Sequence, residues 1–356
     1  MTSTWERLAD LPLRIDDYAL EPLRMNVSSG FERLSTVIHL HGDGAEGVGE
    51  DVTYEADEQE AAWEAGASLP LAGSWTIRSF AEHVGALDLF TGRELERDVY
   101  RRYRRWAYES AALDLALNQA GLPLHEALGR EPRPMNFVVS LRLGEPASLE
   151  PLHQRLANYP TLRFKLDPTP SWTDEIIAGL VGTGAVDSVD FKGHYEGAVV
   201  DVGADPDLYA RVVAAFPDAW YEDPRLTPEI DELLKPHRDR ITWDAPIHSV
   251  ADIEALPFPP RMVNVKPSRF GSLQGLLDAY DWLAARDIGA YGGGQFELGP
   301  GRGQIQLLAS IFHPSTPNDV SPTGFHVDDP PPGLPTSPLE PRPAPTGLRW
   351  DGAPQA

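Results

Sequence analysis

The sequence predicts an α/β protein in which a parallel barrel of alternating strands and helices follows a smaller α+β domain. Between Arg163 and Lys266, five short apolar segments each end in an ionisable residue, at positions 165, 190, 222, 244 and 266. These ends are 25, 32, 22 and 22 residues apart, which suits one strand, one helix and two loops per repeat. The first ~130 residues lack this rhythm, and the chain after Asp328 is rich in proline.

Three strands are predicted in the N-terminal part, over 13–23, 33–40 and 47–54. A turn-rich segment joins the last two. Residues 24–31 are polar and contain glycine, so we expect a mobile loop there. Arg24, Ser28 and Ser29 on this loop are candidates for closing over a substrate. An ordinary solvated loop explains them equally well.

The spacing of apolar residues predicts the next helices and strands, and glycine and proline residues indicate where helices end. A helix is expected over 101–120, because small residues form one face and Gly121 with Pro123 ends it. The alternation begins with a buried strand over 137–141. Its helices are predicted over 172–180, 207–215, 228–234, 253–256 and 273–285, and a strand over 288–295 leads through a glycine-rich turn into a helix over 304–312. An eighth strand is indicated near 324–327, and the proline-rich tail is expected to lie as a strap on another domain.

Composition narrows the classes of function. A formal charge of −24 disfavours nucleic acid and anionic membranes as partners, since both need a basic surface. There are no cysteines, which excludes disulfides, thiolate zinc sites and a cysteine nucleophile. No signal sequence or membrane span is recognisable, so a cytoplasmic protein is expected.

The chain contains few lysines, and most of them lie at or near the ends of the predicted barrel strands. Only four of the 30 basic residues are lysine. Lys165 and Lys266 end two of the segments named above, Lys192 follows Asp190 by two residues at the end of a third, and Lys235 lies elsewhere. Arginine does not give up its proton in proteins, whereas lysine can, so this distribution points to lysine as a base. The alternative is chance together with side chains that reach for solvent.

Three acids follow successive apolar strands. Because the C-terminal ends of barrel strands meet at one rim, Asp190, Glu222 and Asp244 are expected to lie together. Clustered carboxylates need a cation, and oxygen-only ligation suits Mg²⁺ or Mn²⁺. The alternative is that each acid caps the helix that follows it.

Two lysines flank this group of acids. Lys165 and Lys266 lie on strands either side of the acid-bearing strands, so they are expected to face each other across the metal. A metal-bound carboxylate substrate between them could lose its α-proton, because a divalent cation stabilises the resulting enediolate. Arg163, two residues before Lys165, is expected on the same strand face and would lower the pKa of that lysine.

At these residues the chain resembles the enolase superfamily, in particular its muconate-lactonising and o-succinylbenzoate-synthase-like branch. The likeness also includes Gly47-Val48-Gly49-Glu50, the helix around Asp114, Tyr221-Glu222-Asp223-Pro224 and Gly293-Gly294-Gln295-Phe296-Glu297. It implies a modified TIM barrel, (β/α)7β, with an N-terminal α+β capping domain. The domains would be 1–133 (capping), 134–328 (barrel with the active site) and 329–356 (a strap packing on the capping domain).

The resemblance also implies a function. It is Mg²⁺-dependent abstraction of the proton α to the carboxylate of a small-molecule substrate, leading to racemisation or epimerisation, cycloisomerisation or dehydration. One alternative is o-succinylbenzoate synthase itself, and another is a non-catalytic barrel that binds a carboxylate. Barrels with capping domains often associate, so a homo-oligomer is a further expectation.

The chain departs from the family pattern at three places, one of them the eighth strand, which is hard to recognise near 324–327 and leaves part of the substrate pocket undefined. Lys192 stands where the family usually has asparagine, so its ammonium would either weaken the metal site or act as a further acid, base or substrate-binding group. The second-strand motif fits Arg163-Phe164-Lys165 or Lys165-Leu166-Asp167, and we prefer the first because Pro168 ends the strand soon after. The second would put Asp167 in the place of the base.

Two further candidates lie after the seventh predicted strand. Glu297 is expected to form hydrogen bonds, to act as an acid or to cap a helix. The segment 299–303 could bind an anion at a helix N-terminus.

Overall fold

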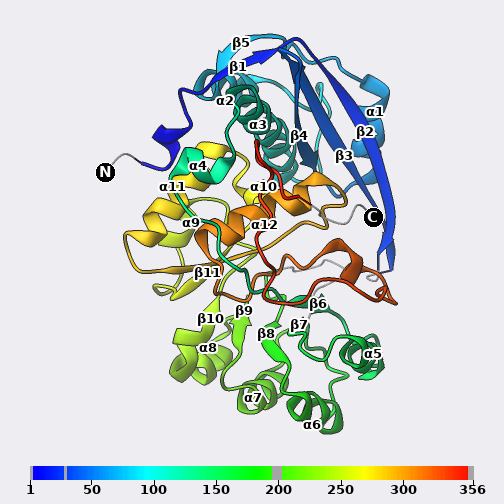
Figure 1. Cartoon of the computed structure of the whole chain (residues 1–356). Coiled ribbons are helices and arrows are strands. Elements are labelled where there is room, and N and C mark those ends of the chain that lie inside the picture. The colour runs from blue at the N-terminus through cyan, green and yellow to red at the C-terminus, as the bar shows by residue number, and fades with distance from the viewer. Residues whose placement is uncertain (1–2, 28–29, 195–202, 352–356) are drawn as a thin grey trace.

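The computed structural model describes residues 3–27, 30–194 and 203–351 and has two parts, a capping domain above a barrel (Figure 1). The elements of the first part are η1 (Trp5–Arg7), β1 (Pro12–Ile15), β2 (Asp17–Val27), β3 (Phe31–Gly42), β4 (Ala45–Asp51), α1 (Ala56–Ala65), β5 (Gly73–Thr76), α2 (Ile77–Ala86), α3 (Val99–Ala120) and α4 (Leu124–Leu128). Strands β2, β3 and β4 form an antiparallel sheet, and β1 pairs with β5. Helix α3 packs along this sheet (Figure 1).

The predicted loop over 24–31 is largely wrong. Strand β2 runs to Val27 and β3 starts at Phe31, so most of the polar segment belongs to a long hairpin. A strand with one solvated face carries polar side chains at alternate positions, and such a polar stretch resembles a loop in the sequence. Ser28 and Ser29 lie outside the described residues. The hairpin reaches the barrel, because the ring of Phe31 packs edge-on against Phe296, with 5.8 Å between the ring centres.

Glycines allow β4 to lie directly on α3. A Cβ on Gly49 would lie 2.1 Å from the carbonyl oxygen of Ala107, and a Cβ on Gly47 would lie 2.3 Å from that of Ala111. The backbones are therefore closer than any side chain permits. This contact explains the spacing of glycines in Gly47-Val48-Gly49-Glu50.

We expect Gly49→Ala to lower the free energy of unfolding by about 3 kcal/mol, because its Cβ meets backbone atoms that cannot move independently. Gly182→Ala is the matched control. An added Cβ there has no neighbour within 4 Å and replaces a helical glycine, so stability should rise by up to about 1 kcal/mol. Chemical denaturation of both variants measures the difference. Equal stabilities would contradict the close packing of β4 on α3.

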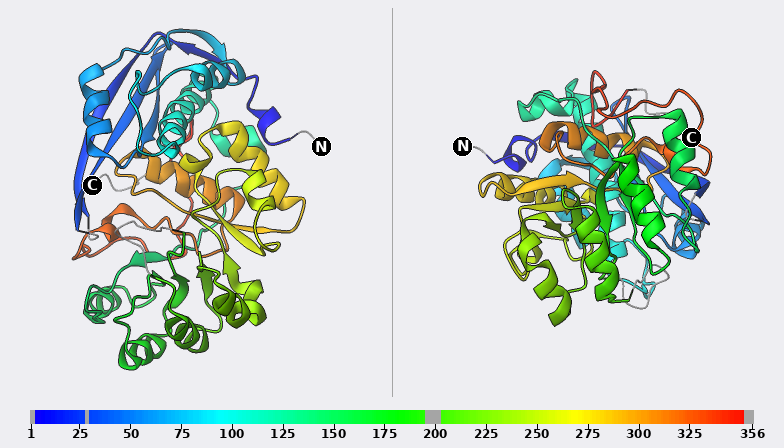
Figure 2. Two further views of the ribbon diagram at one scale, coloured as in Figure 1. Left: turned by 180° about the vertical axis from the view of Figure 1, so that it is seen from behind. Right: turned by 90° about the horizontal axis from the view of Figure 1, so that it is seen from below.

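The barrel repeats strand and helix seven times. Its elements are β6 (Val139–Leu141), α5 (Glu150–Asn158), β7 (Phe164–Leu166), α6 (Asp174–Thr183), β8 (Val186–Asp190), α7 (Pro206–Ala215), β9 (Trp220–Glu222), α8 (Pro228–Leu234), η2 (Lys235–Arg240), β10 (Ile241–Thr242), α9 (Val250–Glu254), β11 (Met262–Val265), α10 (Pro267–Phe270), α11 (Leu273–Ala284), β12 (Gly289–Gly292) and α12 (Pro300–Phe312). Strands β6 to β10 form one parallel sheet and β11 pairs with β12. The Asn264 amide donates to the Trp243 carbonyl at 2.9 Å and so joins the two sheets. Helices surround these strands, as the view from below shows (Figure 2).

The closing strand lies at Asn318–Asp319, and its predicted position at 324–327 is wrong. Asn318 bridges to Phe137 beside β6, and Asp319 bridges to Gly293 beside β12, both in parallel. Thr323–His326 is instead the 3-10 helix η3. The strand is hard to recognise because it is very short and polar; the Asn318 side chain accepts from the Gly292 amide at 2.6 Å. The chain is therefore a (β/α)7β modified TIM barrel with an N-terminal capping domain, as predicted.

The C-terminal segment returns to the capping domain (Figure 1). Asp114 in the middle of α3 accepts from the Leu348 amide at 2.7 Å and pairs with Arg349 at 2.8 Å. The same carboxylate accepts from the Val48 amide at 2.8 Å. One buried acid thus holds β4, α3 and the tail together.

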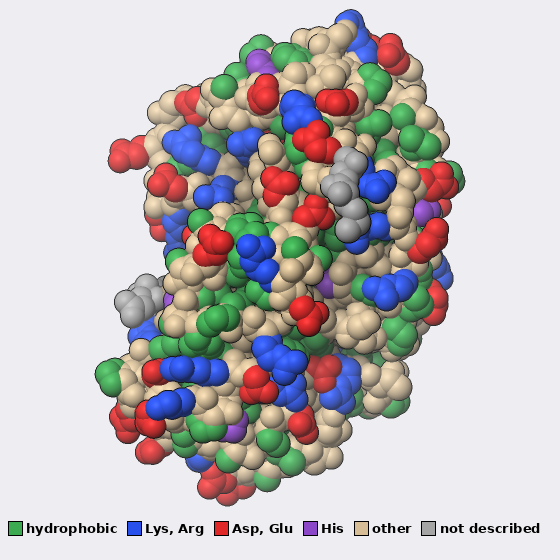
Figure 3. Space-filling view, turned by 90° about the vertical axis from the view of Figure 1, so that its left-hand side faces the viewer, with side chains coloured by type: hydrophobic (Ala, Val, Ile, Leu, Met, Phe, Trp, Pro, Cys, Tyr) green, Lys and Arg blue, Asp and Glu red, His purple; other side chains and the backbone are tan. Residues whose placement is uncertain are grey.

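The surface carries acidic and basic side chains side by side, although the chain is strongly acidic overall (Figure 3). No helix in the described part of the chain is both long and apolar enough to cross a membrane.

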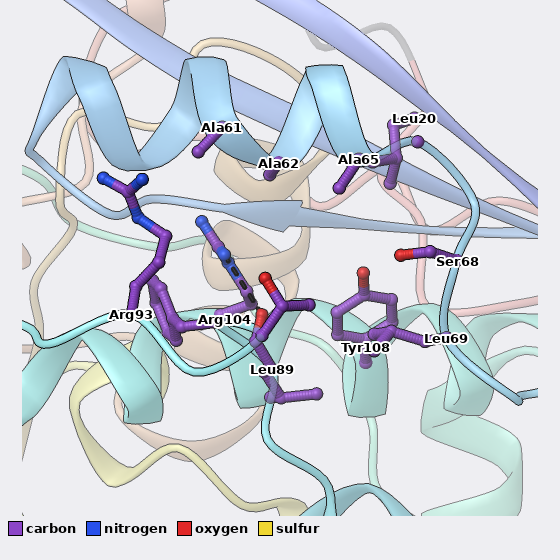
Figure 4. Close-up of a pocket in the computed structure, with 13 residues that line it drawn as sticks. Leu20, Ala61, Ala62, Ala65, Ser68, Leu69, Leu89, Arg93, Arg104 and Tyr108 are labelled. Atoms are coloured by element: carbon purple, nitrogen blue, oxygen red, sulfur yellow. Dashed lines mark hydrogen bonds between the residues drawn. The ribbon is translucent and has the colours of Figure 1, made fainter.

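A small cavity lies inside the capping domain (Figure 4). Ala61, Ala62 and Ala65 of α1 line one side, and Arg104 and Tyr108 of α3 line the other. Its volume is about 30 Å³, which holds water but no organic ligand.

Candidate active site

Five predicted residues come together at the carboxyl ends of the barrel strands. Lys165 lies in β7, Asp190 and Glu222 end β8 and β9, Asp244 follows β10 and Lys266 follows β11. All five side chains are buried. They meet because parallel barrel strands direct their C-terminal ends to one rim.

Lys165 lies in the middle of the carboxylates. Its ammonium contacts Glu222 and lies 3.1 Å from Asp190 and 3.3 Å from Asp319. Burial alone would lower the pKa of Lys165, but these negative charges outweigh burial and raise it well above its usual value. In this arrangement Lys165 is a firmly held cation.

Asp190 has a second ammonium partner. Lys192 donates to its carboxylate, and Lys192 also lies 3.7 Å from Asp167. Burial would raise the pKa of Asp190, yet Lys192 and Lys165 hold it below its usual range. The residue that replaces the family's usual asparagine therefore neutralises the first acid of the cluster.

Glu222 is the least readily ionised acid of the group. The Tyr291 hydroxyl donates to its carboxylate from β12, opposite the Lys165 contact. Burial, reinforced by the charges of Asp190 and Asp244, raises the pKa of Glu222 well above its usual value despite Lys165.

Lys266 forms a separate pair with Asp244. Its ammonium lies 2.9 Å from one oxygen of Asp244, and Arg269 of α10 lies 2.8 Å from the other. Burial lowers the pKa of Lys266, and Arg269 and Lys165 lower it further, against the attraction of Asp244. The two predicted lysines thus differ, since Lys266 gives up its proton more readily than Lys165.

The close carboxylates differ from the predicted set. Ligand atoms of Asp190, Glu222 and Asp223 all lie within 4.8 Å of one another. Asp223 turns inward because its backbone is left-handed, with φ 48°. Its oxygens accept from the amides of Asp244 and Ala245, each at 2.8 Å, and burial together with Asp244 and Asp190 raises its pKa to about 7.

This cluster can hold a metal ion. Its donors are all carboxylate oxygens, the set that hard divalent cations prefer. The ammonium of Lys165 already lies among the same oxygens, so the place attracts positive charge. An ion would compete there with Lys165 and Lys192.

Two predicted residues lie away from the cluster. Arg163 pairs with Asp187 and the Gly184 carbonyl near the start of β8, so the expectation that it lowers the pKa of Lys165 is wrong. It precedes β7 and lies at the other end of the strand. Arg24 pairs with Glu60 at 3.2 Å and stacks on Trp63, both of helix α1, so it does not close over the site.

Two acids that the site prediction left out join the cluster. Asp167 is buried beside Arg142, at 3.0 Å, and near Lys192. Of the two registers considered for the second-strand motif, Lys165-Leu166-Asp167 brings both of its charged residues to the site, whereas the preferred Arg163-Phe164-Lys165 does not, because Arg163 lies at the other end of the strand. Asp319 was missed because the closing strand was predicted at 324–327. In the sequence, its actual position is marked only by two polar residues, Asn318 and Asp319, between Pro317 and Val320.

Glu297 stabilises the loop after β12 within the barrel, and the start of α12 contacts the capping domain. Glu297 accepts from the Gln295 amide at 2.7 Å and pairs with Arg302 at 3.1 Å. The anion at the N-terminus of α12 is Glu50 of β4, which accepts from the amides of Leu298, Gly299 and Gly301 at 2.6, 3.0 and 3.0 Å. The predicted anion site is therefore filled by the protein itself.

Solved structures of the enolase superfamily share this architecture. A dipeptide epimerase from Enterococcus faecalis V583 is 16% identical, with a TM-score of 0.67 over 95% of this chain and 99% of that one. A superfamily member from Roseovarius nubinhibens ISM is 21% identical, with a TM-score of 0.67 over 95% and 94%. A dipeptide epimerase from Methylococcus capsulatus, complexed with Mg ion, is 20% identical, with a TM-score of 0.61 over 89% and 88%.

The chain therefore has the enolase-superfamily fold, and the resemblance predicted from its motifs is confirmed at that level. Its own family is narrower. Residues 6–127 match the N-terminal domain, and residues 131–327 the C-terminal domain, of a domain of unknown function (DUF8230), and the chain belongs to this family. No curated protein matches the sequence.

Proposed function

We propose that the protein is a metal-dependent enzyme that removes the proton α to a substrate carboxylate. The observation that supports this most is the buried carboxylate cluster with a lysine on either side at the barrel rim. Racemases and epimerases among the structural neighbours have the same fold. Racemisation or epimerisation, cycloisomerisation and dehydration all begin with this proton transfer.

We assign different roles to the two lysines because their partners differ. Lys266 has one carboxylate partner, Asp244, and acts as the base that takes the α-proton. Lys165 is surrounded by Asp190, Glu222 and Asp319 and acts as a fixed positive charge facing the opposite side of the substrate. Arg269 holds Asp244 and thereby positions Lys266.

Asp190 and Glu222 would hold the ion, with Asp223 or Asp244 as the third acid, and Mg²⁺ is the ion we propose. A bound Mg²⁺ supplies positive charge that stabilises an enediolate. The capping domain contacts the barrel in this region, because buried Arg33 donates to the Gln295 carbonyl at 3.1 Å and links β3 to the loop after β12.

The competing proposal is a barrel that binds a carboxylate without turnover. It is favoured by one observation, that Lys192 and Lys165 already neutralise Asp190. Proton NMR in D₂O separates the two proposals. The enzyme should exchange the α-proton of at least one member of a panel of carboxylic acids, dipeptides and N-acyl amino acids, and chelation should stop the exchange. A ligand that binds but shows no exchange would favour the non-catalytic barrel.

Lys192→Asn should strengthen Mg²⁺ binding by about tenfold, because the change removes an ammonium that competes for Asp190. Lys235→Asn is the control, since it removes a lysine that pairs with Glu232 on the surface. Calorimetric titration of both variants measures the effect. Weaker binding by Lys192→Asn alone would mean that Lys192 supports the ion instead of competing with it.

A further inference from the structure

We propose that the protein has a second binding site, for a small organic anion, between the capping domain and the barrel. A cavity of about 360 Å³ lies there. Helix α3 contributes three arginines to its wall. The rest of the wall comes from α2, the segment that follows α2, and the turn after α10. A cavity of this size accommodates a small metabolite.

The charge in the cavity comes from one stretch of α3. Arg101, Arg102 and Arg105 line it, whereas Arg104 turns inward and pairs with Asp51 at 2.7 Å. Helical spacing places 101 and 105 on the same face. Three guanidinium groups together favour an oxyanion, either a carboxylate or a phosphate.

The acids that pair with these arginines do not cancel their charge. Asp88 lies 3.5 Å from Arg101, and both side chains are half exposed. Glu109 pairs with Arg105 and also accepts from the Leu273 amide at 2.8 Å. Arg102 donates to the His248 carbonyl at 3.0 Å, a neutral partner. Among the described residues, two acids pair with these three arginines, in a chain whose net charge is −24.

One other feature suits an amphipathic anion. The cavity adjoins Ser272, the N-cap of α11, but Glu109 already occupies that helix N-terminus, so the arginines supply the charge for the ligand. Apolar side chains of Val84, Leu87, Leu89 and Phe270 line the remainder and would cover an apolar body. The ligand class is thus a small carboxylate or phosphate that carries a hydrocarbon or aromatic group.

This cavity is physically connected to the lysine site. Its wall at Phe270 and Gly271 ends helix α10, which starts directly after Lys266 and carries Arg269. Gly271 packs against α3, since a Cβ there would lie 2.7 Å from the Cβ of Arg102. An anion in the cavity would therefore hold α3 and α10 together and restrict the segment that positions Lys266.

The test uses phenyl phosphate, benzoate and inorganic phosphate as probes, titrated calorimetrically into metal-free protein. The double variant Arg101→Gln, Arg102→Gln should weaken binding of the aromatic probes about tenfold. The control, Arg261→Gln with Arg286→Gln, removes two surface arginines elsewhere and should leave the dissociation constant unchanged. Thermal melts check that both variants are folded.

Comparison of phenyl phosphate with benzoate shows whether the site prefers a phosphate or a carboxylate. Inorganic phosphate should bind more weakly than phenyl phosphate because it lacks the ring. Amide hydrogen exchange should slow over residues 267–275 when the better probe is bound. The proposal would be overturned if no probe bound to the unmodified protein at 10 mM, which is roughly the weak limit for such a site. It would also be overturned if both double variants weakened binding equally. Neither result depends on proton abstraction, so the proposed function is tested separately.

Discussion

Lys266→Met should reduce α-proton exchange by roughly 10³-fold, because it removes the proposed base while keeping a side chain of similar length. Lys266 is only 8% exposed, and its ammonium lies 2.9 Å from Asp244. Methionine leaves the charge of Asp244 partly balanced by Arg269, so the fold and the cluster should survive. Exchange is measured by proton NMR in D₂O with the best substrate from the panel.

Arg24→Gln is the control for this prediction. It removes a positive charge that pairs with Glu32 and Glu60 on the capping domain, away from the cluster. Exchange should therefore remain at the unmodified rate. If Lys266→Met retained most of the exchange, Lys165 would have to be the base, in spite of its three carboxylate neighbours.

Glu222→Gln should weaken binding of Mn²⁺ at least about a hundredfold, because it removes a charged ligand at constant shape. The variant also leaves Lys165 without one of its carboxylates, so that ammonium would bind more strongly to Asp190 and oppose the ion further. Electron paramagnetic resonance of free Mn²⁺ measures the loss directly.

Glu297→Gln is the matched control, since Glu297 is equally buried but pairs with Arg302 in the loop after β12. Its affinity for Mn²⁺ should stay within about twofold of the unmodified value. Equal losses in the two variants would assign the effect to general destabilisation of the barrel rim.

The sequence was sufficient to predict the barrel because its strands end in a regular series of charged residues. Each of Lys165, Asp190 and Glu222 follows apolar residues at a strand end, and parallel strands bring such ends together. The motif Gly47-Val48-Gly49-Glu50 contributed to the family resemblance, and the structure explains its glycines by the close contact of β4 with α3.

The positions of Asp223, Arg163 and Asp319 depend on backbone geometry that the pattern of residue types does not reveal. Asp223 would point away from Glu222 in a regular strand, and only its left-handed backbone turns it inward. Arg163 has the right spacing from Lys165 but lies where β7 begins, beside Asp187. The two-residue closing strand that carries Asp319 is too short for periodicity to reveal.

The most direct test of the metal-dependent account is titration of metal-free protein with Mg²⁺ by calorimetry. We expect one site with a dissociation constant below about 1 mM, because two or three buried carboxylates supply the ligands. A saturable heat of binding should be seen only when Asp190 and Glu222 are intact. If neither Mg²⁺ nor Mn²⁺ binds, the ammonium groups of Lys165 and Lys192 have taken the place of the ion, and metal-dependent proton abstraction is wrong for this protein.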